Sequence, residues 1–187
     1  MKKLLSIAAA GLLLLGVSFQ ASAIEDPDPV GSITANAYLG FAPGFGVNAS
    51  ADYVLINKWW KGHFTVGAYA GFYADKETKS SSAVGVTVTN KDTEAYFSLM
   101  PRATYGLNIT DSFEVHAGTM AGVNFGAHKV NNSASGVGSE KSSETSAGFA
   151  FSEIVGCRYY FTDNLGVSAE IGYGSVSYMN IGVSYRF

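Results

Sequence analysis

The last ten residues of the chain, Tyr178 to Phe187, alternate strictly between apolar and polar side chains. The apolar set is Met179, Ile181, Val183, Tyr185 and Phe187. A period of two places successive side chains on opposite faces of a β-strand. A strand of about 9–11 residues with one apolar and one polar face has the length and pattern needed to cross a lipid bilayer at a tilt. We therefore predict a membrane-spanning strand here and expect the rest of the chain to repeat its pattern.

Seven more segments show the same alternation. They cover about residues 32–41, 45–55, 64–73, 95–107, 113–127, 148–161 and 165–173. Lipid offers no hydrogen-bonding partner to an open sheet edge, so strands that cross a membrane must close into a ring. The sequence thus predicts an all-β fold, an eight-stranded antiparallel up-and-down transmembrane β-barrel over residues 31–187.

The connections between the segments differ in length. Residues 109–112 and 162–164 are tight turns, whereas Asp75–Asp92 and Lys129–Ser146 are long and polar. With both chain ends on the inner side of the membrane, the long connections fall outside and the tight turns inside. Aromatic residues gather at both ends of the predicted strands, as rings do at the two membrane interfaces. We therefore expect residues 75–92 and 129–146 to be extracellular loops.

The N-terminus has the features of a secretory signal peptide. Two lysines precede the apolar run Leu4–Val17, and small residues follow at positions 21–23. This pattern predicts a cleaved signal peptide over residues 1–23, with cleavage between Ala23 and Ile24. Residues 24–30 would then form a short periplasmic leader.

Charge and cysteine content exclude two classes of protein. Removing Lys2 and Lys3 from the 12 basic residues leaves 10 against 15 acidic residues, a formal charge of −5. An acidic chain lacks the concentrated basic surface that nucleic acid binding needs. The single cysteine, Cys157, cannot form an internal disulfide.

Three stretches resemble a known family. They are Gly156–Gly166, Ala169–Gly174 and the terminal strand. On these stretches the chain from Ser32 onward resembles the small eight-stranded outer-membrane proteins of the OmpA/OmpX type, and the outer-membrane β-barrel domain proteins common in Bacteroidetes-like bacteria.

The resemblance implies a location and an assembly route. A protein of this type lies in the cell outer membrane of a Gram-negative bacterium, among lipid and lipopolysaccharide, and is inserted by the barrel assembly machinery. The C-terminal aromatic residues, Tyr185 and Phe187, would be part of the assembly signal. The resemblance implies neither a reaction nor a cofactor.

Ionisable side chains occupy several inward-facing positions. They are Asp52, Arg102, Glu114, His116, Arg158, Glu170 and Arg186. Eight strands leave an interior just wide enough for side chains to fill. Because three arginines balance three carboxylates, we predict an ion-pair network that plugs the lumen. Arg158 and Glu170 flank the 162–164 turn and are predicted to pair with each other.

Two residues do not fit the pattern of the predicted strands. Glu153 falls at a lipid-facing position, where a charge near mid-bilayer is costly. We expect either a β-bulge at residues 152–154 or a position for Glu153 nearer the outer rim. Pro101 lies inside a predicted strand and lacks one ladder donor, which predicts a kink there.

The pattern favours a monomeric, non-enzymatic barrel with a structural or surface-interaction role, such as membrane integrity, adhesion or evasion. The two long loops would contact any extracellular protein partner. Residues 83–89 could extend the strands as a protruding hairpin whose edge pairs with a partner strand, or form a solvated loop without a partner. Both loops balance their charges, which does not indicate electrostatic capture of lipopolysaccharide.

Two alternative functions remain open at this point. One is a narrow channel for small solutes, and the other is an enzyme that modifies lipid A. His128 is the one histidine at the outer end, and no spacing links it to Asp75, Glu77 or a serine. The sequence contains no Gly-x-Ser-x-Gly motif, metal-ligand cluster or phosphate-binding loop. We therefore predict no catalytic, cofactor-binding or metal-binding residues.

Overall fold

The computed structural model describes residues 28–41, 44–83, 86–134, 137–173 and 177–187. The predicted signal peptide and its cleavage site at Ala23 and Ile24 lie outside the described residues. A helix with the length and apolar character needed to span a bilayer is not found in the described part of the chain.

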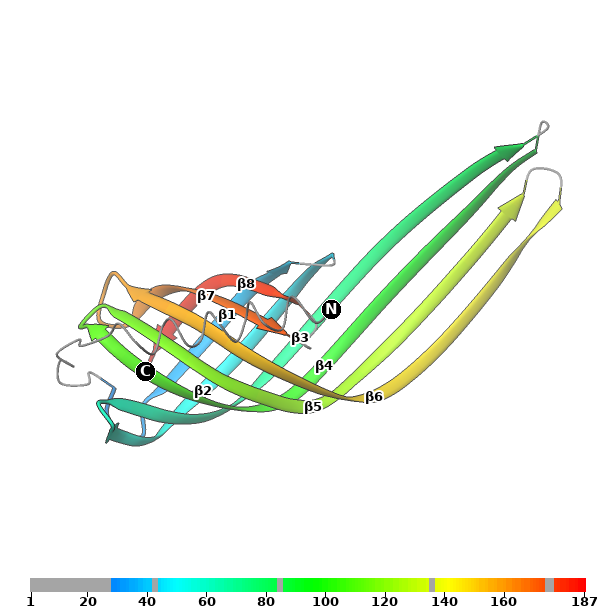
Figure 1. Cartoon of the computed structure of the whole chain (residues 1–187). Helices are drawn as coiled ribbons and strands as arrows, with labels where there is room; N and C mark the ends of the chain where they lie inside the picture. The colour runs from blue at the N-terminus through cyan, green and yellow to red at the C-terminus, as the bar shows by residue number, and fades with distance from the viewer. Residues whose placement is uncertain (1–27, 42–43, 84–85, 135–136, 174–176) are drawn as a thin grey trace, which may run out of the picture.

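Eight strands form one closed ring (Figure 1). They are β1 (Ile33–Phe41), β2 (Phe45–Trp59), β3 (Gly62–Ala83), β4 (Val86–Thr110), β5 (Phe113–Ala134), β6 (Val137–Tyr160), β7 (Leu165–Tyr173) and β8 (Met179–Arg186). Each strand pairs antiparallel with the next, and β8 closes the ring against β1. The predicted eight-stranded up-and-down barrel is confirmed.

The alternation of side chains gives the barrel a polar interior and an apolar exterior. On β1, Thr34, Asn36 and Tyr38 are buried inside, whereas Ile33 and Leu39 are 42% and 48% exposed outside. The same inversion continues on β8, where the exposed residues include Ile181 and Val183. An apolar exterior is favourable only against lipid, because water would make it unstable.

The described residues of 75–92 and 129–146 are strand, which corrects the prediction of loops and agrees with the alternative of a protruding hairpin at residues 83–89. β3 continues to Ala83 and β4 begins at Val86, while β5 continues to Ala134 and β6 begins at Val137. Alternating Val and Thr between Val86 and Thr89 favour an extended backbone. Water on both sides of these segments removes the need for a continuous apolar face, so most of their other residues are polar.

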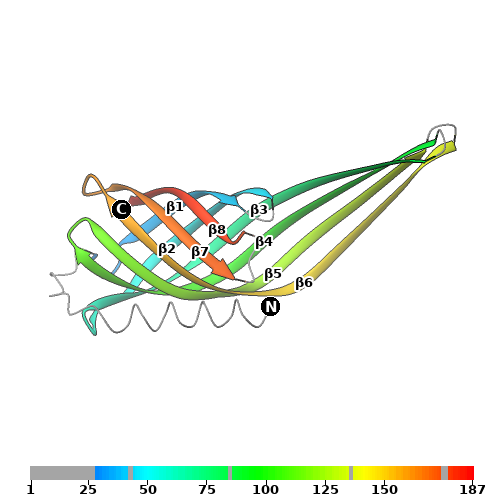
Figure 2. The same ribbon diagram turned by 45° about the horizontal axis from the view of Figure 1, so that its top comes forward.

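The other four strands end much sooner at this side of the barrel. The last β2–β3 pair is Phe45 with Ala74, and the last β6–β7 pair is Glu153 with Tyr173. Beyond them β3 to β6 continue as a four-stranded sheet (Figures 1 and 2). We call residues 75–94 and 128–144 of these strands the extension.

Glu153 lies at the outer rim without a bulge. It pairs with Thr119 and with Tyr173, the last residue of β7, in an uninterrupted register. The predicted bulge at residues 152–154 is therefore wrong, and Glu153 lies at the outer end of the β6–β7 ladder. At Pro101 the β4–β5 pairing is interrupted and then resumes in the same register.

Candidate functional site

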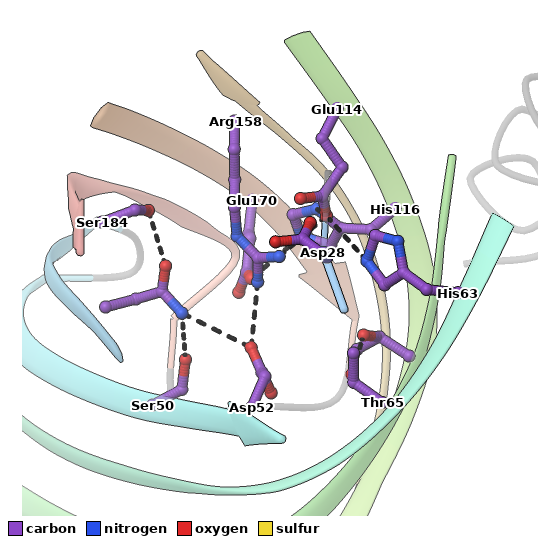
Figure 3. Close-up of polar contacts among 12 residues, drawn as sticks. Asp28, Ser50, Asp52, His63, Thr65, Glu114, His116, Arg158, Glu170 and Ser184 are labelled. Atoms are coloured by element: carbon purple, nitrogen blue, oxygen red, sulfur yellow. Dashed lines mark hydrogen bonds and ion pairs between the residues drawn. The ribbon is translucent and has the colours of Figure 1, made fainter. Parts of the chain in front are cut away.

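Arg158 lies at the centre of the lumen and joins two carboxylates. Its Nη1 donates to Glu114 Oε1 at 2.7 Å, and its Nη2 donates to Asp52 Oδ2 at 2.9 Å (Figure 3). These three residues come from β6, β5 and β2, so the contacts cross the interior rather than follow one pair of strands. Charge-assisted bonds of this length are among the stronger hydrogen bonds in proteins.

A second arginine extends the same network. Arg102 Nε lies 2.9 Å from Asp52 Oδ1, and Arg102 Nη2 donates to Glu170 Oε1 at 2.9 Å. His116 Nε2 lies 3.0 Å from Glu170 Oε1 and its Nδ1 lies 3.4 Å from Glu114 Oε1. The contacts therefore close into a ring, which we call the lumen ring. Its members are Asp52, Arg102, Glu114, His116, Arg158 and Glu170.

The lumen ring is shielded from solvent. Its six residues are between 1% and 3% exposed. Two guanidinium groups face three carboxylates, so the ring carries one excess negative charge when His116 is neutral. Neutral donors surround it: Tyr38 donates to Glu170 Oε1 at 2.9 Å, and Asn36 links Ser50 and Ser184. Buried charges are tolerated when paired and hydrogen-bonded in this way.

The predicted pairing of Arg158 with Glu170 is wrong. In the β6–β7 register Arg158 lies opposite Ser168, and Glu170 lies opposite Gly156. The long arginine side chain extends across the lumen to β5 and β2 instead of to the adjacent strand. Glu170 takes Arg102 of β4 and His116 of β5 as its partners.

Gly156 makes room for the lumen ring. A Cβ atom built at this position would lie 2.5 Å from His116 Nε2 and 2.8 Å from Glu170 Cγ. It would also lie 2.7 Å from the Ala169 carbonyl oxygen. A side chain here would therefore push apart the contact between His116 and Glu170.

Arg186 lies in the lumen as predicted by its parity, but outside the lumen ring. Its Nη2 donates to Asp28 Oδ2 at 3.1 Å, and its guanidinium lies 3.9 Å from the centre of the Tyr160 ring. Asp28 is 2% exposed, although the sequence placed it in a leader outside the barrel. The leader lies outside any strand, so no parity rule could place Asp28.

An apolar cluster fills the lumen on the extension side of the ring. Its buried members are Tyr69, Met100, Met120, Ala150 and Ile154. Met100 is two residues from Arg102 along β4, and Ile154 is four residues from Arg158 along β6. Strand parity places these residues inside, although none of them carries a charge that would single it out in the sequence.

Two groups of side chains bring possible metal ligands together among the described residues. Their ligand atoms lie within 4.8 Å of one another in Asp28, His63 and Glu114, and in Asp92, Glu94 and His128. In the first group Glu114 is bonded to Arg158 and Asp28 to Arg186, so arginines already supply the positive charge. The carboxylates of this first group are therefore already paired with cations of the protein.

His128 has carboxylate neighbours on the extension. Its Nε2 lies 2.5 Å from Asp92 Oδ1 and 3.9 Å from Glu94 Oε1. The sequence did not link these residues, because register, not spacing, brings β4 and β5 together. A histidine oriented by a carboxylate is one part of a hydrolytic triad, which also needs a nucleophile. No serine contact to His128 occurs among the described hydrogen bonds.

The C-terminal aromatic residues lie on the lipid-facing side of β8. The Tyr185 and Phe187 rings are in edge contact, with centroids 4.8 Å apart. The Phe187 amide donates to the Ile33 carbonyl at 2.9 Å, so the final residue takes part in ring closure. The role of both residues in assembly stays a prediction.

Comparison with known proteins gives a match to one family model. The outer membrane protein beta-barrel domain matches residues 7–187. Comparison with the curated proteins gives no match.

Several solved structures are similar at low identity. Ail, the attachment invasion locus protein of Yersinia pestis, in complex with the heparin analogue sucrose octasulfate, is 19% identical, with a TM-score of 0.40 over 83% of this chain and 95% of that chain. The N-terminal beta-barrel domain of Pseudomonas aeruginosa OprF is 18% identical, with a TM-score of 0.44 over 84% and 98%. Neisserial surface protein A is 16% identical, with a TM-score of 0.38 over 83% and 92%.

The family match covers nearly all of the chain, including every strand of the closed ring and its apolar exterior. The chain therefore belongs to the outer membrane protein beta-barrel domain family, and the protein resides in the cell outer membrane.

Proposed function

We propose that this protein is a monomeric, non-catalytic barrel whose extension carries a surface-interaction role, such as adhesion or evasion. The observation that carries the proposal is the length of β3 to β6. All four strands keep regular pairing past the ends of β2 and β7, as far as the pairs Ala83–Val86 and Ala134–Val137. Strands that continue past the ends of β2 and β7 have no role in closing the barrel.

The extension supplies two kinds of binding surface. Its sheet has two faces, and among the described residues its outer strands, β3 past Ala74 and β6 before Glu153, each pair with only one neighbouring strand. An extended segment of another protein can add a strand at such an edge. Rigid paired strands also lose less conformational freedom on binding than flexible loops do.

The lumen ring and the apolar cluster support a barrel closed to solutes. Arg102, Arg158 and Glu170 extend into the interior from three strands, and Met100 and Met120 fill the space above them. We therefore expect purified protein in planar bilayers to show no steady ion conductance. A stable open channel would instead favour the alternative of a solute pore.

A variant that lacks the extension tests the proposal. All four strands are cut at the same row of paired residues. Ala74, Ala95, Ala127 and Thr145 lie opposite one another on the four strands. Joining Ala74 to Ala95 and Ala127 to Thr145, each through an Asn-Gly turn, keeps the barrel wall intact. Bacteria that display this variant should lose adhesion to surfaces coated with extracellular matrix, while the barrel remains folded and inserted.

A control and an accessibility test complete the experiment. The double substitution Thr110→Ser and Ser112→Thr at the opposite turn should leave adhesion unchanged. Protease added to intact cells should cut the native protein between residues 75 and 94 or between 128 and 144. Adhesion that survives removal of the extension, or an extension that external protease never reaches, would contradict the proposal.

A further inference from the structure

The two faces of the extension differ in charge. One face continues the lumen wall and the other continues the lipid-facing wall; we call them the lumen-side and lipid-side faces. Asp75, Glu94, His128 and Glu144 form one cross-strand row of the lumen-side face. Glu77 and Asp92 follow in the next row. The described carboxylates of the extension therefore all lie on the lumen-side face.

By register, Lys76, Lys91, Lys129 and Lys141 of the extension lie on the lipid-side face, whereas Lys79 lies opposite Asn90 in a row of the lumen-side face. Lys76 and Lys129 lie in one row with Thr93 and Ser143, and Lys91 lies in the next row with Thr78 and Asn131. Lys76, Lys91 and Lys129 are exposed. Their cross-strand neighbours on this face are uncharged, so no carboxylate lies directly opposite them. The balanced charge of these segments in the sequence therefore conceals a separation by face.

The lysines lie just above the membrane-facing aromatic residues. Phe72, Phe97 and Phe125 form a row of the outer wall and are 44% to 48% exposed. A row of alanines separates them from Lys76 and Lys129. Two rows correspond to about 13 Å along a strand, and the tilt of barrel strands lowers the height to about 10 Å. The aromatic rings mark the interface, so Lys76 and Lys129 lie at the level of the polar headgroups, and Lys91 lies one row farther from the membrane.

We propose that Lys76, Lys91 and Lys129 form a docking surface for the phosphate-bearing headgroups of the outer leaflet. Each ammonium group can donate three hydrogen bonds to phosphate oxygens as a compact point charge. Lys76 and Lys129 are two strands apart, about 10 Å, and Lys91 lies on the strand between them one row farther out. This spacing suits phosphates on neighbouring headgroups better than a single phosphate.

The negative charge of the rest of the molecule favours a lipid headgroup over a soluble polyanion as the ligand of these lysines. The chain is acidic, with a formal net charge of −3, and the lumen-side face adds carboxylates close by. Long-range fields of this sign slow the approach of a free polyanion. Insertion of the barrel brings headgroups to the lysines without such an approach. The proposal goes beyond the adhesive role, because it concerns the membrane that holds the barrel.

The test measures which lipid the protein retains. Full-length mature protein is inserted into nanodiscs of phosphatidylcholine with a minority of doubly phosphorylated lipid A, then extracted in mild detergent. Retained lipid A per protein is counted by mass spectrometry. We expect enrichment over the bulk fraction, and about a fivefold loss of preference for each lysine changed to glutamine at low salt. K76Q/K91Q/K129Q should then retain lipid A no better than its bulk fraction.

Three control measurements test whether the enrichment depends on positive charge and on the phosphates of the lipid. K76R/K91R/K129R keeps the charge and should keep the enrichment, and high salt should reduce it. Lipid A stripped of both phosphates should not be enriched. The proposal is overturned if K76Q/K91Q/K129Q retains lipid A like the native protein, if the stripped lipid is enriched equally, or if soluble inositol hexakisphosphate displaces the lipid at equal concentration. Because the readout is lipid retention, its outcome is independent of the adhesion assay.

Discussion

The barrel and the extension are built from the same strands, yet they arrange charge in opposite ways. Inside the barrel, Arg102 and Arg158 alternate with carboxylates in one closed ring, and every member is nearly inaccessible to water. In the extension, Lys76, Lys91 and Lys129 lie on one face and the described carboxylates on the other, where Lys79 is also placed by register. A buried charge must be paired because the interior screens it poorly, whereas water and salt screen an exposed one.

The buried charges of the lumen ring contribute to stability, whereas the exposed charges of the extension are available for recognition. Removing one member of the lumen ring takes a hydrogen-bonding partner of opposite charge away from a buried side chain. Removing a charge from the extension changes the surface potential but leaves nothing stranded. Equivalent substitutions in the two regions should therefore differ in their effect on the free energy of unfolding.

Glu170→Ala should have the largest effect. It removes the carboxylate that Arg102, His116 and Tyr38 share, and should lower the free energy of unfolding by about 3–5 kcal/mol. The measurement is urea unfolding in lipid vesicles, supported by the heat-induced mobility shift on gels. Glu144→Ala, an exposed carboxylate of the extension, is the matched control and should change stability by less than about 0.5 kcal/mol.

Double substitutions identify the partner of Glu170. Leucine at both Glu170 and Arg102 should recover much of the loss, because it removes both charges of a contacting pair. Leucine at both Glu170 and Arg158 should not recover the loss, because these two side chains take part in different ion pairs of the ring. Recovery in the second variant but not the first would reverse this assignment.

Gly156→Ala should have the next largest effect. Its Cβ would approach the Ala169 carbonyl oxygen at 2.7 Å and Glu170 Cγ at 2.8 Å, so the lumen ring must shift. We expect a loss of about 1–3 kcal/mol in the same unfolding measurement. Gly148→Ala is the control on the same strand, since a Cβ there meets nothing within 4 Å. Equal losses at both glycines would show that strand propensity, not the ring, is responsible.

The barrel architecture was predictable because a strand that crosses the bilayer must alternate between an apolar and a polar face. The alternation ending in Tyr185 and Phe187 specifies strands, faces and closure. The pattern fails where the hydrocarbon core of the bilayer no longer contacts the chain. Lys76 to Ala83 and Lys129 to Ala134 are polar on both faces, so their strands look like loops in the sequence.

Six of the seven residues predicted for the ion-pair network form the lumen ring, whereas Arg186 pairs with Asp28 outside it, and the pairings within the ring were not predicted. Parity places Asp52, Arg102 and Arg158 inside, and all three are buried there. Their partners depend on how far an arginine reaches across the lumen, and adjacent-strand reasoning cannot capture that distance. Asp28 was missed for a different reason, since its burial follows from packing of the leader against β2 and β8.

Asp28→Asn should have a moderate effect, because it tests the inner end of the lumen. It weakens the ion pair with Arg186, whose side chain is 11% exposed and also stacks on Tyr160. We expect a loss of about 1–2 kcal/mol in the urea measurement, less than for Glu170→Ala. Asp163→Asn in the exposed β6–β7 turn is the control and should be neutral. A loss as large as that of Glu170→Ala would mean that Asp28 is part of the central network.

Asp75→Asn should have the smallest effect, and it acts only on the extension. Asp75 lies directly opposite Glu94, and like charges at opposed positions destabilise a strand pair by a few tenths of a kcal/mol. Asparagine keeps the acceptor that the Lys76 amide uses and removes the charge. The barrel should unfold as before, while local opening of the extension should become about twofold rarer at low salt. Proteolysis rates of the extension in intact vesicles report this opening, and high salt should abolish the difference because it screens the repulsion. A change in barrel stability, or a difference that persists in high salt, would mean that the extension is not the independently opening, solvent-screened region that its separated charges indicate.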